Sequence, residues 1–170
     1  DLRSGDPVVA GTTAVVPAPD GAGPPPAGPA GAVAQDDGRT ALVAVVPLGR
    51  LTAGQAELLA GTAARDLQLT PWRSVVVPDL PDASAAEGLS AAGLVLDPGS
   101  AWLRVTACAG LPGCRKSLAD VRADATAAVR AGTLPADGAR QHWVGCERRC
   151  GRPSGDVVDV VATPSGYRVG

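Results

Sequence analysis

The sequence predicts an α+β fold in two parts, which differ in pattern and in cysteine content. Over residues 39–97, β-branched apolar runs typical of strands alternate with runs rich in alanine and leucine at helical spacing. Residues 98–170 contain all four cysteines, together with one long helical pattern and further strand-like runs. We therefore expect two α+β units in sequence, with the cysteines confined to the second.

Residues 1–38 are predicted to form a flexible linker. Proline and glycine punctuate this segment, and GAGPPPAGPAGA lies at its centre. Such a composition buries too little apolar surface to offset the entropy of ordering the chain. Val8-Val9 and Val15-Val16 are the two places in the segment where short strands are compatible with the pattern.

Five elements are expected in the first unit. They are strands over 40–48, 74–77 and 94–96, a helix that begins after Thr52, and a second helix over 84–92. Thr52 and Gln55 form a capping-box pattern, Pro78 is expected to stop the second strand, and Gly93 to end the second helix. Strand–helix–strand–helix–strand over roughly sixty residues predicts a ferredoxin-like half domain.

Four elements are expected in the second unit. They are a strand over 101–107, a helix over 114–131, a strand over 141–144 and a closing hairpin over 156–169. The turn 97–100 (DPGS) separates this unit from the first. Because Gly132 follows the helical pattern directly, we expect the helix to end there.

The four cysteines form two close pairs. Cys108 and Cys114 are a Cys-x5-Cys pair, and Cys146 and Cys150 are a Cys-x3-Cys pair. Three interpretations compete: a [4Fe–4S] cluster, a zinc ion, and disulfides or free thiols. Zinc sites favour ligands separated by two to four residues, whereas a cubane cluster accepts wider spacings, and disulfides need an oxidising compartment.

The residues around the cysteines favour the cluster. Gly110, Gly113, Gly145 and Gly151 lie within or beside the pairs, and glycine lets backbone N–H groups approach the sulfurs of a cluster. The helix predicted to begin at Cys114 would also direct its positive end towards a negative thiolate cluster.

Composition excludes several classes of function. The net charge of −2 does not indicate a basic surface for binding nucleic acid, and no apolar run is long enough to span a membrane. The first residues carry no hydrophobic signal region, so we expect a cytoplasmic protein in which four reduced cysteines imply a metal. Because the sequence begins at Asp1 rather than methionine, we expect it to be part of a longer protein.

The cysteine motif TACAGLPGC…GCERRCGRP resembles the cluster-binding motif of the nitrite and sulfite reductase superfamily. The resemblance departs from the reductases at residues 147–149, where they have small or neutral residues. It is nearer to precorrin-3B synthase, as judged from LTPWRSVVVPDL (69–80) and GLVLDPGSAWLRVTACAGLPGC (93–114). This implies an α+β iron–sulfur domain of the nitrite/sulfite reductase type over 98–170. It also implies a [4Fe–4S] cluster on Cys108, Cys114, Cys146 and Cys150, next to a tetrapyrrole.

The resemblance implies an oxidoreductase. The expected reaction is the O2-dependent hydroxylation of precorrin-3A in cobalamin biosynthesis, with electrons from a reduced donor. Only the second of two pseudo-symmetric halves would be present, so the N-terminal half is an expected partner and this chain alone is expected to be inactive. One alternative is a fragment of a sirohaem-dependent nitrite or sulfite reductase. Another is a non-enzymatic structural module whose fold a bound metal stabilises.

Three arginines are candidates for binding the carboxylate arms of a tetrapyrrole substrate, because guanidinium forks suit carboxylates. They are Arg73, Arg148 and Arg149. The single histidine, His142, is expected to be packed or solvated rather than catalytic. The three tryptophans are expected to be core residues.

Overall fold

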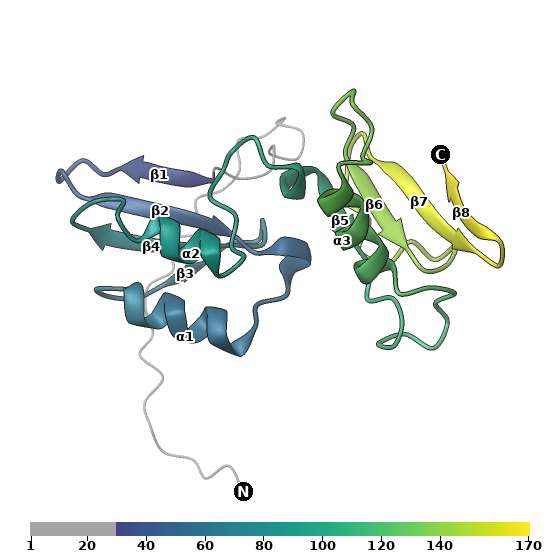
Figure 1. The fold of residues 1–170 in the computed structure, drawn as a ribbon, viewed down its shortest axis with the longest axis horizontal. Coiled ribbons are helices and arrows are strands. Elements are labelled where there is room, and N and C mark those ends of the chain that lie inside the picture. The colour runs from purple at the N-terminus through teal and green to yellow at the C-terminus, as the bar shows by residue number, and fades with distance from the viewer. Residues whose placement is uncertain (1–29) are drawn as a thin grey trace, which may run out of the picture.

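The computed structural model describes residues 30–170, which form two lobes that each contain a four-stranded sheet (Figure 1). The first lobe comprises residues 31–96 and the second residues 101–170. The α+β class is confirmed. No helix within residues 30–170 is both long and apolar enough to cross a membrane.

The sheet of the first lobe is antiparallel throughout. Its strands are β1 (Gly31–Ala34), β2 (Thr40–Val45), β3 (Gln68–Leu69) and β4 (Ser74–Leu80), in the order β1-β2-β4-β3. Strand β2 is central, and five of its six residues are buried, as its unbroken apolar sequence requires. The other strands are arranged around this buried strand.

Strand β1 falls inside the segment predicted to be a linker, so the predicted linker boundary at residue 38 is wrong. The segment turns back at residues 35–38, where the Gln35 N–H donates to the Arg39 carbonyl at 2.9 Å. The Gln35 side chain also accepts from the backbone N–H of Asp79 at 2.8 Å and so ties the turn to β4. The small side chains of β1 are compatible with a strand here, because backbone groups make the hydrogen bonds between β1 and β2. Val8-Val9 and Val15-Val16 lie outside the described residues.

Two helices cover one face of this sheet (Figure 1). Helix α1 (Ala53–Thr62) begins where the sequence predicts, because Thr52 and Gln55 form a complete capping box. Helix α2 (Ala86–Ala91) is shorter than predicted. Leu59 from α1 and Leu89 from α2 pack with alternate residues of β2 and β4 in one buried core. A short 3-10 helix, η1 (Pro47–Gly49), leads from β2 towards α1.

Two strand predictions in this lobe need correction. Strand β4 continues through Pro78 because the register of β2 and β4 shifts there, and a proline is tolerated at such an irregularity. Asp79 takes a positive φ of 62° beside it. The strand predicted over 94–96 is reduced to one isolated bridge between Val95 and Val45.

The second lobe is a mixed sheet in the order β5-β6-β7-β8. Its elements are η2 (Ala101–Arg104), β5 (Val105–Ala107), α3 (Val121–Ala131), β6 (Gln141–Val144), β7 (Val158–Thr163) and β8 (Gly166–Val169). Strands β5, β6 and β7 run parallel, and β7 and β8 form the predicted hairpin. Parallel neighbours require crossover connections. Helix α3 makes the first crossover and buries Val121 and Ala125, whereas residues 145–157 make the second without a helix.

Two boundaries in this lobe differ from the predictions. Residues 101–104 form the 3-10 helix η2 rather than the beginning of a strand, because the Ser100 hydroxyl accepts from the Trp102 N–H and starts a helical turn. Helix α3 begins at Val121 and not at Cys114, since Asp120 is its N-cap and accepts from the Ala123 N–H at 3.1 Å. It ends as predicted at Gly132, which adopts a φ of 65°.

Two adjacent leucines of α1 test the core of the first lobe. Leu59 is fully buried and Leu58 is 37% exposed. We expect Leu59→Ala to lower the free energy of unfolding by about 2–5 kcal/mol, because it leaves a cavity in the core. Leu58→Ala is the matched control and should cost about 1 kcal/mol or less, within the range of surface changes. Urea unfolding measures both, and equal losses would contradict the described core.

Candidate metal centre

The two cysteine pairs lie at one edge of the second sheet. Cys108 follows β5 directly, and Cys146 follows β6 after a single glycine. Because β5 and β6 are parallel neighbours, with Ala107 opposite Trp143, their carboxyl ends meet at the same edge. Ligand sites in sheets with parallel strands form beyond such carboxyl ends. The topology therefore brings together two segments that are far apart in sequence.

Three hydrogen bonds join the two cysteine segments. The Cys108 N–H donates to the Trp143 carbonyl at 2.9 Å and extends the pairing of the strands. The Gly145 N–H donates to the Cys108 Sγ at 3.3 Å. The Leu118 N–H in turn donates to the Gly145 carbonyl at 2.8 Å. Gly145 is thus bonded on both sides of its peptide unit to the segment that carries the first cysteine pair.

Gly145 also allows these segments to approach closely. A Cβ atom built on Gly145 would lie 1.7 Å from the Ser117 Oγ and 2.6 Å from the Ser117 Cβ. Ser117 is itself buried, and its hydroxyl donates to the Ala119 carbonyl at 2.7 Å. No residue with a side chain fits at position 145 unless Ser117 and its segment move.

The first cysteine pair lies in a compact loop rather than on a helix. The Cys114 N–H donates to the Gly110 carbonyl at 2.7 Å, and the Ser117 N–H donates to the Cys114 carbonyl at 3.0 Å. The positive end of a helix predicted at Cys114 is therefore absent, since α3 begins seven residues later. A different positive charge lies beside the loop. The Arg122 Nε donates to the Cys108 carbonyl at 3.0 Å, and its buried Nη1 has no partner within residues 30–170.

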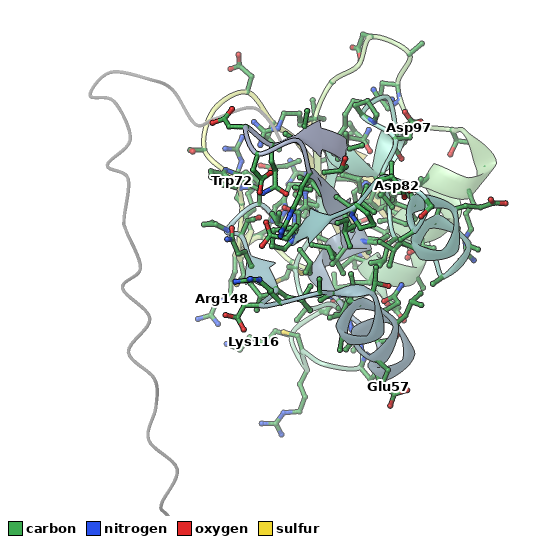
Figure 2. The ribbon with its side chains drawn as sticks, turned by 90° about the vertical axis from the view of Figure 1, so that its left-hand side faces the viewer. Glu57, Trp72, Asp82, Asp97, Lys116 and Arg148 are labelled. Atoms are coloured by element: carbon green, nitrogen blue, oxygen red, sulfur yellow. The ribbon has the colours of Figure 1, made fainter. Side chains whose placement is uncertain are left out.

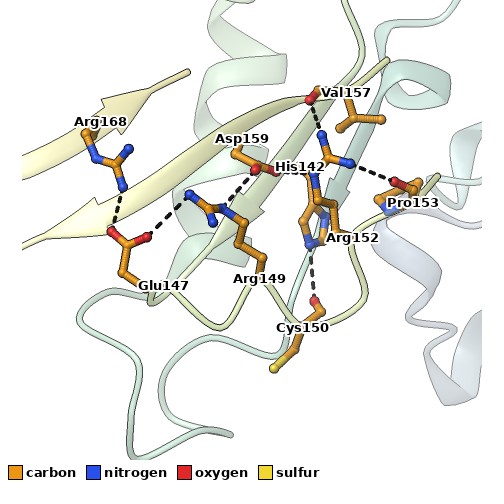
Figure 3. A network of polar contacts seen from close by, with 9 residues as sticks. All are labelled: His142, Glu147, Arg149, Cys150, Arg152, Pro153, Val157, Asp159 and Arg168. Carbon is orange, nitrogen blue, oxygen red and sulfur yellow. Dashed lines mark hydrogen bonds and ion pairs between the residues drawn. The ribbon is translucent and has the colours of Figure 1, made fainter. Parts of the chain in front are cut away.

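The second cysteine pair lies in the crossover segment 145–157, which two arginines fasten to β7 (Figure 3). The Arg149 Nε and the Arg152 Nε lie 2.9 and 3.0 Å from the two carboxylate oxygens of Asp159. Asp159 is only 7% exposed, so two guanidinium groups compensate one buried carboxylate. Glu147 continues the network to Arg149 and, across to β8, to Arg168.

His142 holds the middle of this crossover through a hydrogen bond to the Cys150 carbonyl. It is fully buried on β6, and its Nε2 lies 3.1 Å from the Cys150 carbonyl. A carbonyl only accepts, so Nε2 carries the hydrogen, and Nδ1 lies 2.8 Å from the Thr106 hydroxyl. Burial lowers the pKa of His142, in agreement with a neutral ring. The expectation that this histidine is packed is confirmed.

The four thiols differ in exposure. Cys108, Cys114 and Cys146 are half-buried and Cys150 is exposed, and all four are free. Within residues 30–170, no three Cys, His, Asp or Glu side chains form a group that could hold a single metal ion. Soft thiolates, a backbone N–H on sulfur and an uncompensated guanidinium nevertheless match the needs of a negative iron–sulfur cluster.

The three arginines predicted to bind substrate are not brought together. Arg149 is paired with Asp159. Arg148 is exposed and lines a shallow pocket with Lys116, and both side chains project from the surface in Figure 2. Arg73 lies between the lobes, where its Nη1 donates to the Val105 carbonyl at 2.9 Å. Their proposed contact with a substrate remains a prediction.

Sequence reasoning missed the supporting residues Asp159, Arg152 and Ser117. One signal was available for Asp159, because a lone carboxylate inside the apolar run VVDVVA indicates a buried charge that requires partners. No local signal indicates Ser117, whose contact with Gly145 depends on the parallel pairing of two separate segments.

Comparisons with known proteins agree with this architecture. Residues 33–92 match the family model described as "Nitrite/Sulfite reductase ferredoxin-like half domain". Residues 33–92 have the fold of that half domain. Among solved structures, the chain is similar to the NirA protein of Mycobacterium tuberculosis, with a TM-score of 0.62 and 22% sequence identity. No curated protein sequence matches the chain significantly.

The structural similarity to NirA extends beyond the half domain. The similarity to NirA covers 82% of this chain but only 30% of NirA. At this sequence identity the similarity defines the fold and not the reaction. The prediction of a ferredoxin-like half domain in the first lobe is therefore confirmed, and the finer resemblance to precorrin-3B synthase remains a proposal.

The contact between Gly145 and Ser117 can be tested by a paired substitution. We expect Gly145→Ala to lower the free energy of unfolding by about 1–3 kcal/mol, because the added methyl group overpacks a buried contact. Ser117→Gly in the same chain removes the side-chain atoms that clash, so the double variant should recover part of this loss. Thermal and urea unfolding measure both. A double variant no more stable than Gly145→Ala would contradict the steric explanation.

The hydrogen bond from His142 to Cys150 gives a second prediction. His142→Phe removes the N–H donor and leaves the Cys150 carbonyl without its partner, which should cost about 1–3 kcal/mol of stability. His142→Gln is the matched variant, because its Nε2 can still donate. Urea unfolding should therefore rank the wild type above Gln and Gln above Phe. Equal stabilities of the two variants would show that packing, and not the hydrogen bond, accounts for the role of His142.

Proposed function

We propose that Cys108, Cys114, Cys146 and Cys150 bind one [4Fe–4S] cluster. The observation that carries this proposal is the hydrogen bond from the Gly145 N–H to the Cys108 Sγ, which joins the two cysteine segments at one edge of the sheet. Hydrogen bonds from the backbone to sulfur are among the features that tune such clusters. Arg122, which donates to the Cys108 carbonyl and whose buried Nη1 has no partner within residues 30–170, supplies positive charge beside the same loop.

The sequence spacing of the cysteines supports a cluster better than a zinc ion. A structural zinc site needs four ligands within about 2.0–2.3 Å of one ion. In a cubane cluster each thiolate binds a different iron, so the sulfurs need not converge on one point. The first pair, Cys108 and Cys114, is separated by five residues, which is wider than the spacing that zinc sites favour.

We further propose that the chain is the C-terminal part of an oxidoreductase of the precorrin-3B synthase type. The cysteine motif and the LTPWRSVVVPDL segment support this proposal through their resemblance to that family. When bound, the cluster would supply electrons, received from a reduced donor, for O2-dependent hydroxylation of precorrin-3A. The chain spans only 30% of NirA. We therefore propose, together with this reaction, a tetrapyrrole substrate, a cytoplasmic location and an N-terminal half as a partner.

The chain's own residues would contribute positioning in this reaction. Asp159, Arg149 and Arg152 would hold the loop of the second cysteine pair, and Gly145 would hold the first pair against it. The exposed Arg148 would be free to contact a carboxylate arm of the substrate at the surface beside Cys146, with which it lines one pocket.

A sirohaem-dependent nitrite or sulfite reductase is the second candidate. It is favoured by the match of residues 33–92 to the reductase half-domain model, which fits this alternative equally well. In that case Cys150, the most exposed of the four thiols, is the residue that would face the sirohaem. An absorption spectrum recorded after reconstitution with sirohaem, beside an assay of precorrin-3A conversion, separates the two candidates.

Metal and acid-labile sulfide analysis tests the cluster itself. Anaerobic reconstitution of the chain should give a brown protein with about four irons and four sulfides, as a cubane on four thiolates requires. Cys108→Ser should lose most of the bound iron. It should also unfold at a lower temperature than the reconstituted wild type, because metal binding is coupled to folding. Ser117→Ala is a control nearby that leaves all four thiols in place.

Two outcomes would overturn the cluster proposal. One is a colourless protein that binds a single zinc ion. The other is full iron content in Cys108→Ser, with an unfolding temperature equal to that of the wild type.

A further inference from the structure

A small cavity at the junction of the two lobes is lined by three arginines. Arg73 comes from the start of the first lobe's β4, and Arg104 and Arg140 come from the second lobe. The cavity has a volume of about 150 Å³, and no aspartate or glutamate lines it. Three positive charges therefore meet in a cavity whose lining residues carry no negative charge.

Partial burial of these guanidinium groups costs free energy, which no acidic residue in the cavity lining offsets. Arg73 is half-buried, and both its burial and the nearby charge of Arg140 lower its pKa. Within residues 30–170, none of the three arginines forms an ion pair. Removing a guanidinium from water is repaid only by an opposite charge and by hydrogen bonds. The lone hydrogen bond from Arg73 to the Val105 carbonyl leaves most of its donors unused.

A neutral donor completes the lining. Gln141 is 5% exposed, and its Oε1 accepts from the Trp143 Nε1 at 3.0 Å. Gln141 lines the cavity, and its Nε2 donates to no other residue among those described, so its amide retains free donors. The Thr106 hydroxyl is already engaged with Gln141 and His142. The free polar groups of the cavity are therefore donors, as an acceptor ligand requires.

We propose that this cavity binds one oxyanion group. Its volume is below the range of about 300–1,000 Å³ found for sites that enclose a whole organic ligand. It is suited to a single group such as a phosphate, a sulfate or one carboxylate. Guanidinium forks bind such groups through paired hydrogen bonds. The group is either a free inorganic anion or the end of one carboxylate arm of a larger molecule.

The site goes beyond the proposed cluster and is separate from it. It is formed at the amino ends of β5 and β6, whereas the cysteines follow the carboxyl ends of the same strands. Because the first lobe contributes Arg73 and the second contributes the other donors, the bound anion would also join the two lobes. Iron content measured on the same variants distinguishes failure of the anion site from failure of the cluster.

Calorimetric titration of the full chain at low ionic strength tests the proposal, with inorganic phosphate and with coproporphyrin, a macrocycle that carries four propionates, as separate probes. Arg140→Gln removes a side chain that forms no hydrogen bond within residues 30–170, so the fold should persist. It should weaken binding about tenfold or more, the equivalent of one charge-assisted hydrogen bond. Arg104→Gln is a second variant with the same expected effect. Trp72, which lines the cavity and is 44% exposed, should report binding by a change in fluorescence.

Arg65→Gln is the matched control, because Arg65 is exposed and lies outside the cavity. It should bind both probes as the wild type does. Phosphate binding that Arg140→Gln weakens would support a free anion as the ligand. Coproporphyrin binding alone, weakened in the same way, would support a carboxylate arm. Binding of neither probe, or equal affinities in Arg140→Gln, Arg65→Gln and the wild type, would overturn the proposal. An equal loss of affinity in Arg140→Gln and in the control Arg65→Gln would also overturn it.

Discussion

The close contact between Gly145 and Ser117 is the constraint on which the second lobe's cysteine segments depend. It exists because β5 and β6 are parallel neighbours, so the segments that leave them start side by side. The Gly145 peptide then bonds to Cys108 on one side and to Leu118 on the other. Without this close approach the two cysteine segments would be joined only by the strand pairing and the bond from the Cys108 N–H to the Trp143 carbonyl.

The second crossover is arranged around a different interaction, a buried carboxylate. A parallel connection usually contains a helix, which satisfies its own backbone groups. Residues 145–157 have no helix. Asp159 on β7 instead holds the crossover in place by forming ion pairs with Arg149 and Arg152. His142 satisfies the Cys150 carbonyl on the same segment. Side chains of the sheet thus anchor the crossover, and His142 satisfies one carbonyl that a helix would have satisfied internally.

The sequence predicts elements well where their signals are local. Helix α1 begins at its capping box, Gly132 ends α3, and the hairpin of β7 and β8 forms around its turn. It fails where tertiary hydrogen bonds replace local ones. Residues 114–120 read as helix, yet Leu118 donates to Gly145 instead of to its own helix. Trp72 was expected in the core but is 44% exposed, because it lies in the turn at the lobe junction.

The same distinction between local and tertiary signals applies to the candidate sites. The four cysteines are recognisable from their spacing alone, whereas the arginine-lined cavity depends on how two separately built lobes meet. The parallel pairing of β5 with β6 joins residues about 36 positions apart, as in Val105 with Gln141. Contacts at such separations form late in folding. The two cysteine pairs therefore come together only when this non-local pairing forms, and neither segment can complete a four-thiol site alone.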